Sequence, residues 1–126
     1  MKKIFFTCFA SIGLLLSCSE DETTQQQEAQ ELANMLTEIK KMSASETCND
    51  PLKWAFTAIG IKVCGGPTSY IPYSKNIDTL KFLNNVNDYN IAEEKFQKKW
   101  GIYSDCKVIR KPSKIICQNG NPVFEY

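Results

Sequence analysis

The 126-residue chain contains no histidine. This absence removes the commonest metal ligand and the commonest general base, and it excludes every Ser-His or Cys-His catalytic dyad. The chain also carries little net charge, +1, so no strong overall field points to nucleic acid as a partner. With 23% charged and 43% hydrophobic residues, it has the composition of one small globular unit. We therefore expect a small folded domain that is not an enzyme and holds no metal or cofactor.

The N-terminus has the pattern of an export signal. Lys2 and Lys3 precede an apolar stretch over residues 4–16, which is too short to cross a bilayer core of about 30 Å. It matches the hydrophobic region of a secretory signal peptide. The segment Leu15-Leu16-Ser17-Cys18 that ends it resembles a lipobox, the processing site of bacterial lipoproteins. The resemblance implies that residues 1–17 are removed and that Cys18 carries diacylglycerol and a further acyl chain such as palmitate, which anchors the protein permanently in a membrane.

Residues 18–47 are predicted to form the lipid anchor, an acidic tether and a short helix. Seven acidic and two basic residues lie between positions 19 and 47, whereas residues 48–126 hold eleven basic and seven acidic residues. Glu20, Asp21 and Glu22 directly follow the anchor cysteine, and this cluster resembles the surface-export signal of lipoproteins in the Bacteroidota. The resemblance implies exposure on the outer face of the outer membrane. The alternative is an ordinary solvated linker on a lipoprotein that faces the periplasm.

Apolar residues recur at helical spacing late in this segment, which predicts an amphipathic helix over about residues 28–42. Two roles remain open for it. The helix either docks on its own domain or engages a partner helix.

Residues 48–126 are predicted to form the folded domain. A strand is expected over residues 54–59, continuing past a bulge at Gly60, followed by a Gly-Gly-Pro turn and an extended segment over residues 69–73. A helix over about residues 77–100, capped by Ser74 or Asn76, should end at Gly101. Strands over residues 107–110 and 114–117 are expected to form a hairpin, and a last strand follows the Asn119-Gly120 turn. The predicted class is α+β: a small antiparallel sheet with one long helix packed across it, preceded by a short helix and a flexible tether.

Four cysteines remain in this domain, and outside the cytoplasm an even number of thiols predicts two disulfides. Their spacings of 16, 42 and 11 residues contain no C-x₂₋₄-C pair, which disfavours zinc. We favour Cys64–Cys106 with Cys48–Cys117, because this pairing ties the Gly-Gly-Pro turn to the far end of the helix and the domain's entry to its last strands. Both loops that it closes are also long, which enlarges the chain-entropy contribution. The alternative pairs Cys106 with Cys117 across a hairpin and leaves Cys48–Cys64.

The most distinctive segment is Gly60-Ile61-Lys62-Val63-Cys64-Gly65-Gly66-Pro67, continuing through Tyr70 and Tyr73 to Ser74. Together with the later Ser104-Asp105-Cys106 and Cys117-Gln118-Asn119-Gly120, it resembles a group of small exported bacterial proteins without an established activity. The resemblance supports the fold and export only. Related chains carry two more cysteines at the positions of Trp54 and Pro122, which implies that the first and last strands lie side by side.

Candidate binding residues gather in the same segment: Gly65, Gly66, Pro67, Tyr70 and Tyr73. The two tyrosines, three residues apart on an extended segment, are expected on one exposed side. Four basic residues of the expected hairpin, Lys107, Arg110, Lys111 and Lys114, are either solvated strand edges or a patch for an anionic partner such as polysaccharide or lipid headgroups.

Three functions are compatible with these features. We expect a membrane-anchored envelope lipoprotein that presents a small binding or inhibitor-like domain to a protein or glycan. A structural or accessory subunit of an outer-membrane complex is the alternative. A small hydrolase is least favoured, because the aspartates are dispersed and no histidine is present.

Overall fold

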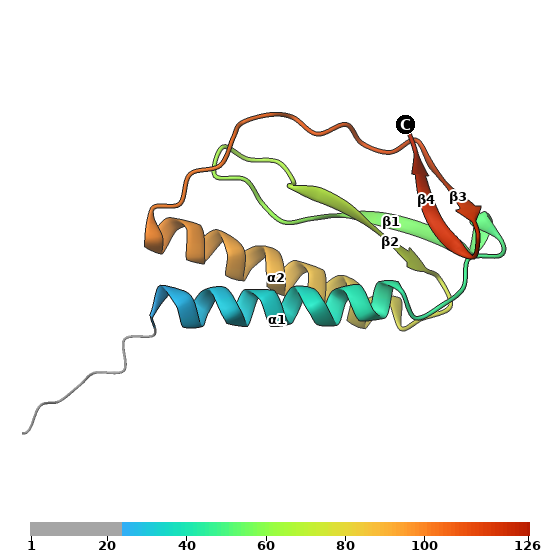
Figure 1. The fold of residues 1–126 in the computed structure, drawn as a ribbon, viewed down its shortest axis with the longest axis horizontal. Helices are drawn as coiled ribbons and strands as arrows, with labels where there is room; N and C mark the ends of the chain where they lie inside the picture. The colour runs from blue at the N-terminus through green and yellow to red at the C-terminus, as the bar shows by residue number, and fades with distance from the viewer. Residues whose placement is uncertain (1–23) are drawn as a thin grey trace, which may run out of the picture.

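The computed structural model describes residues 24–126, which form two α-helices and two separate two-stranded antiparallel sheets (Figure 1). The helices are α1 (Gln25–Ser43) and α2 (Thr79–Trp100), and a short 3-10 helix, η1 (Pro51–Lys53), lies between them in the chain. The strands are β1 (Trp54–Ile59), β2 (Ser69–Ser74), β3 (Lys114–Gln118) and β4 (Asn121–Glu125). This confirms the α+β class. Neither helix of the described region is long and apolar enough to cross a membrane.

The predicted signal peptide (residues 1–17), Cys18 and the acidic run at 20–22 lie outside the described residues.

Both helices begin at side-chain caps that differ from the predicted boundaries. Thr24 and Gln27 form a reciprocal capping box at the start of α1. The Thr24 hydroxyl accepts from the Gln27 N–H, and the Gln27 side chain accepts from the Thr24 N–H. Helix α1 therefore starts three residues earlier than expected. Asp78 caps α2 by accepting from the Lys81 N–H at 3.0 Å. Neither of the two expected caps has this role: Ser74 is buried and accepts from the Asn76 N–H instead. The predicted end at Gly101 is confirmed, and its φ of +60° is the left-handed conformation that glycine favours.

Strands β1 and β2 form a ribbon with two different faces. Trp54 lies opposite Ser74, and Ile59 lies opposite Ser69. Because alternate residues share a face, one face carries Ile59, Ile71 and Tyr73 towards the helices, while Trp54, Phe56 and Tyr70 lie on the other. The predicted continuation of β1 beyond Gly60 is wrong, because Gly60 adopts φ +75° and the chain leaves the extended conformation there.

The predicted hairpin between residues 107–110 and 114–117 is also wrong. Strand β3 pairs with β4 instead, around Asn119 and Gly120, whose φ values of +50° and +76° suit the tight turn expected of an Asn-Gly pair. Residues 102–113 contain no helix or strand and form a strap from α2 to β3. The strap is held at its end, where the Ser113 N–H and hydroxyl both donate to the Glu125 carbonyl.

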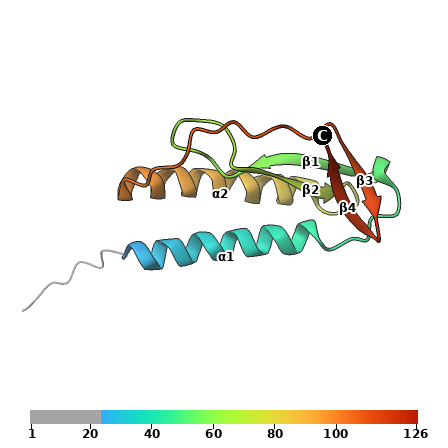
Figure 2. The same ribbon diagram turned by 45° about the horizontal axis from the view of Figure 1, so that its top comes forward.

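The core has two parts, one on each face of the ribbon. The helices and the ribbon enclose the larger cluster, which comprises Ile39, Ile59, Ile71, Phe82, Val86 and Tyr89. The β3–β4 hairpin lies across the end of the ribbon where β1 begins (Figure 2) and contributes Ile115 to a second cluster with Cys48 and Trp54. Helix α1 therefore belongs to the compact domain, and Ile39 is only 1% exposed.

The single predicted sheet is thus replaced by two. Strands β1 and β4 are not hydrogen-bonded neighbours, and they meet through the rings of Phe56 and Phe124, whose centroids are 5.7 Å apart.

Two disulfides connect these parts. Cys48–Cys117 lies at the second cluster, with Cys48 almost fully buried, and Cys64–Cys106 joins the Gly-Gly-Pro loop to the strap. The favoured pairing of the four cysteines is thereby confirmed.

Candidate binding groove

The loop between β1 and β2, residues 60–68, is held against α2 by side chains one helical turn apart. The Gly60 N–H donates to the Asn90 amide oxygen at 2.7 Å, and the Ile61 N–H donates to Glu93 Oε2 at 2.7 Å. Gln97 in turn donates to the Ile61 carbonyl at 2.8 Å. Because residues three and four apart share one helix face, α2 presents a row of polar groups that replaces the missing strand partners of this loop.

Tyr89 completes this row from within the core. Its hydroxyl donates to Glu93 Oε1 at 3.3 Å, while the other carboxylate oxygen binds the Ile61 N–H. Burial, and secondarily the Glu93 charge, raises the pKa of Tyr89 to about 12. The phenol therefore remains a hydrogen-bond donor that orients Glu93 towards the loop.

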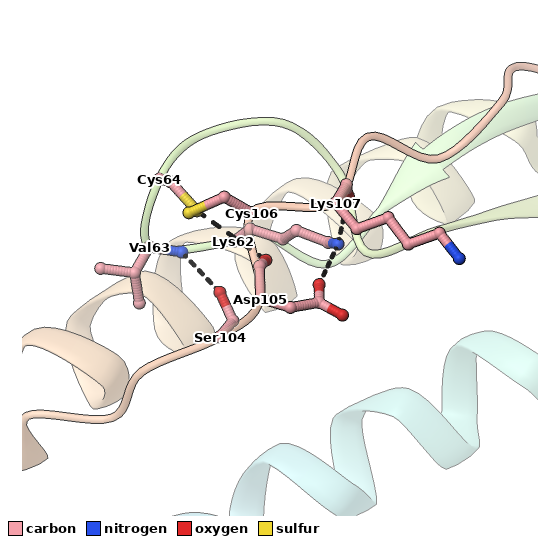
Figure 3. The surroundings of a disulfide bond; sticks show 7 residues. All are labelled: Lys62, Val63, Cys64, Ser104, Asp105, Cys106 and Lys107. Atoms are coloured by element: carbon pink, nitrogen blue, oxygen red, sulfur yellow. Dashed lines mark hydrogen bonds and ion pairs between the residues drawn. A yellow bond between two sulfur atoms is a disulfide. The ribbon is translucent and has the colours of Figure 1, made fainter.

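The tip of the loop is fixed to the strap by a second set of contacts (Figure 3). The Lys62 side chain is only 10% exposed, and its ammonium lies 2.7 Å from Asp105 Oδ1 and donates to the Lys107 carbonyl at 2.6 Å. Hydrogen bonding to Lys62 holds the pKa of Asp105 below its usual value. The Val63 N–H donates to the Ser104 hydroxyl, and Cys64–Cys106 adds the covalent link. Loop and strap therefore form one rigid unit.

The candidate binding residues of the sequence do not form one surface. Tyr70 and Tyr73 lie on opposite faces of β2, because strand side chains alternate with a period of two. Tyr73 packs against Phe82 of α2 with ring centroids 4.9 Å apart, so its expected role on an exposed face is wrong. Gly65 and Gly66 lie in the exposed loop tip, where no atom beyond their chain neighbours comes within 4 Å of a Cβ position on either residue.

Tyr70 instead lines an open groove of about 590 Å³ between the start of β2, the strap and the end of β4. The Tyr70 ring lies edge-on to Phe56, at 6.0 Å, and Phe56 contacts Phe124, which in turn contacts Tyr126 at 6.5 Å. A row of aromatic rings thus runs beneath and along the groove.

The strap supplies the opposite wall of the groove, with residues 107–110. Lys107 and Arg110 are both exposed, and the part of the chain that the structure describes places no carboxylate side chain in the lining of the groove. Among residues 24–126, no ion pair involves Lys107, Arg110 or Lys111. Lys114 pairs with Glu125 at 3.2 Å and lies outside the groove. Of the four residues of the predicted basic patch, only Lys107 and Arg110 line the groove, together with the aromatic side chains.

Sequence reasoning missed Phe124 and Tyr126 as groove residues. Their i, i+2 spacing, with Phe124 in β4 and Tyr126 just after it, indicates a common face, but only the structure shows that this face meets Tyr70.

All four cysteines between residues 24 and 126 are joined in disulfides, so none of them offers a thiolate. No cluster of three or more potential metal-ligating side chains occurs between residues 24 and 126.

No family model, no curated protein and no solved structure matches this chain.

Proposed function

We propose that the protein is a lipid-anchored envelope module that binds an anionic saccharide in the groove between Tyr70, Arg110 and Tyr126. The observation that carries this proposal is the placement of Lys107 and Arg110, which form no ion pair within residues 24–126, beside aromatic rings in an open groove whose described lining has no acidic side chain. Aromatic faces offer rigid apolar contact to the C–H faces of sugar rings, and guanidinium groups bind carboxylate or phosphate in a bidentate manner.

The rigidity of the groove supports a binding role. Lys107 follows Cys106 directly, and its carbonyl is held by Lys62, so one wall is fixed before a ligand arrives. A preorganised wall lowers the entropy cost of binding.

Membrane attachment through Cys18 is the second part of the proposal. The two disulfides are consistent with an extracytoplasmic location. We propose that the acyl chains on Cys18 hold the domain at the bacterial outer membrane. If Glu20, Asp21 and Glu22 direct surface exposure, replacing all three with alanine will protect the protein from protease added to intact cells; unchanged digestion would leave the acids as a linker.

The alternative, an accessory subunit that recruits a partner through α1, has no observation to favour it. The apolar face of α1 is occupied by its own domain, with Ile39 in the larger core cluster.

The saccharide proposal is tested by titrating the full-length protein with three probes. These are a uronic-acid oligosaccharide, a phosphorylated oligosaccharide and a neutral oligosaccharide of equal length. Binding of either charged sugar, with at least tenfold weaker binding of the neutral one, supports the proposal and identifies the anionic group. Equal binding of the neutral sugar, or no binding of any probe, contradicts it. Polyphosphate serves as a polyanion without sugar rings, and equally tight binding of it would show general charge attraction rather than saccharide recognition.

Two variants locate the site. Arg110→Gln should weaken binding roughly tenfold or more, the effect expected for loss of a charge-assisted hydrogen bond. Lys111→Gln removes the same charge from the neighbouring position, which does not line the groove, and should change affinity less than about twofold. Tyr126→Ala should weaken saccharide binding while leaving polyphosphate binding unchanged. Equal effects of the two charge substitutions would place the site elsewhere.

A further inference from the structure

One end of the molecule brings together the start of α1, the end of α2 and the loop between β1 and β2 (Figures 1 and 2). Glu28 in the first turn of α1 joins two of these parts. Its carboxylate accepts from the Trp100 indole at 2.8 Å and pairs with Lys99 at 2.5 Å. The point at which the chain enters the domain is therefore attached to the end of α2.

Cys18 precedes Thr24 by only six residues. Even fully extended, six residues span about 20 Å, at 3.3–3.6 Å each. An acylated Cys18 would therefore keep this end of the domain within about 20 Å of the lipid headgroups, while the β3–β4 hairpin lies towards the opposite end (Figure 1). This step rests on the proposed anchoring through Cys18.

Two apolar side chains are exposed at this same end. Tyr103 is 91% exposed on the strap, and Val63 is 53% exposed at the loop tip. The Val63 N–H is bonded to the Ser104 hydroxyl, next to Tyr103 (Figure 3). Both residues stand on the rigid unit of loop and strap, beside the Cys64–Cys106 bond.

Three lysines at this end are paired with carboxylates. Lys62 binds Asp105, Lys98 binds Glu94, and Lys99 binds Glu28. These paired charges neither attract nor repel a membrane strongly, so at Val63 and Tyr103 apolar contact is available for binding. A tyrosine is well suited to such a boundary, since its ring is apolar and its hydroxyl remains hydrated among headgroups.

We propose that this end is a lipid-docking surface: Val63 and Tyr103 insert into the headgroup region of the bilayer that holds Cys18. Contact with the bilayer then orients the domain, with α1 and α2 directed away from the membrane and η1 at the distal end. The Cys64–Cys106 bond contributes by joining the two backbone segments that carry these residues, which lowers the entropy cost of contact.

The test uses the full-length acylated protein in phosphatidylethanolamine/phosphatidylglycerol vesicles. A fluorophore is attached through a ketone-bearing amino acid at position 63, 103 or 52, and lipids brominated near the headgroup act as quenchers. Leu52 of η1 is the matched control, since it is apolar and 82% exposed, and η1 leads into the start of β1 at the hairpin end of the ribbon. We expect at least twofold stronger quenching at positions 63 and 103 than at position 52.

A second measurement separates docking from anchoring. The double variant Val63→Ser/Tyr103→Ser changes only exposed side chains, so it should fold, remain attached to vesicles in flotation and show faster rotation of a label at position 52. Flotation with equal quenching at all three positions, or unchanged rotation in the variant, would overturn docking but leave the anchor intact. Failure of the wild-type protein to float would instead refute the anchor, and the docking proposal with it.

Discussion

Gly60 and Thr68 approach so closely that a Cβ on Gly60 would lie 1.8 Å from Thr68 Oγ1. The Thr68 hydroxyl donates to the Ile59 carbonyl at 3.1 Å, so it closes the base of the loop between β1 and β2. Glycine is thus required at position 60 for two reasons. The backbone has a left-handed φ of +75°, and Thr68 occupies the space that a Cβ would need.

Gly60→Ala should therefore destabilise the domain more than backbone strain alone predicts. Gly66→Ala is the matched control, because Gly66 also has a positive φ, +83°, but no atom lies near its Cβ position. We expect a loss of about 1–2 kcal/mol in the free energy of unfolding for Gly66→Ala and at least ~1 kcal/mol more for Gly60→Ala. Urea unfolding under oxidising conditions measures both, and equal losses would contradict the close packing against Thr68.

The two disulfides should differ in their effects on fold and binding. They close separations of 69 and 42 residues, for which the chain-entropy model assigns about 4 kcal/mol each. Cys48–Cys117 also contributes buried sulfur to the second core cluster, so Cys48→Ser/Cys117→Ser should destabilise the domain more. Cys64→Ser/Cys106→Ser should leave a folded domain that binds its saccharide more weakly, because Lys107 loses its covalently fixed neighbour. Thermal unfolding and the saccharide titration measure the two effects. The assignment is wrong if removal of Cys64–Cys106 leaves the affinity unchanged.

Tyr89 should make the domain sensitive to alkaline pH. Its pKa is raised from 10.0 to about 12 in the folded state, first by burial and then by Glu93. An unfolded chain loses this proton near pH 10 while the folded domain retains it, so stability falls as pH rises from 10 towards 12. Tyr89→Phe should reduce that fall, and Tyr103→Phe, which removes an exposed phenol, should not. Unfolding free energies at several pH values test this, and an identical slope in wild type and Tyr89→Phe would exclude the assignment.

Local chemistry explains which elements could be predicted from the sequence. Residues that tolerate positive φ predict the Asn119-Gly120 turn and the end of the helix at Gly101. Pro72 predicts an edge strand, and it lies in a two-stranded sheet, in which both strands are edges. The expected strand over residues 107–110 failed because long-range contacts determine that segment. Lys62 and Cys64 hold its beginning away from β3, and no local pattern encodes those contacts.

The candidate site was predictable only in part, for a related reason. The sequence predicts Tyr70 and Tyr73 on one exposed side, but a strand separates residues three apart, so Tyr70 lines the groove whereas Tyr73 packs against Phe82. Arg110 was assigned to a hairpin and lies instead on the strap. The groove arises where β2, the strap and β4 meet, so it depends on tertiary packing that residue spacing alone does not specify.

The membrane anchor is tested most directly at Cys18. Cys18→Ala should leave an uncleaved precursor that is not labelled by radioactive palmitate, because the lipid-bearing sulfur and the processing site are lost together. Cys8→Ala is the matched control: it removes a cysteine from within the predicted signal peptide and should be processed and labelled normally. Metabolic labelling and gel mobility distinguish the precursor from the mature form. Normal processing and labelling of Cys18→Ala would refute the anchor, and loss of labelling in both variants would show that the signal peptide, rather than Cys18 itself, had been disturbed.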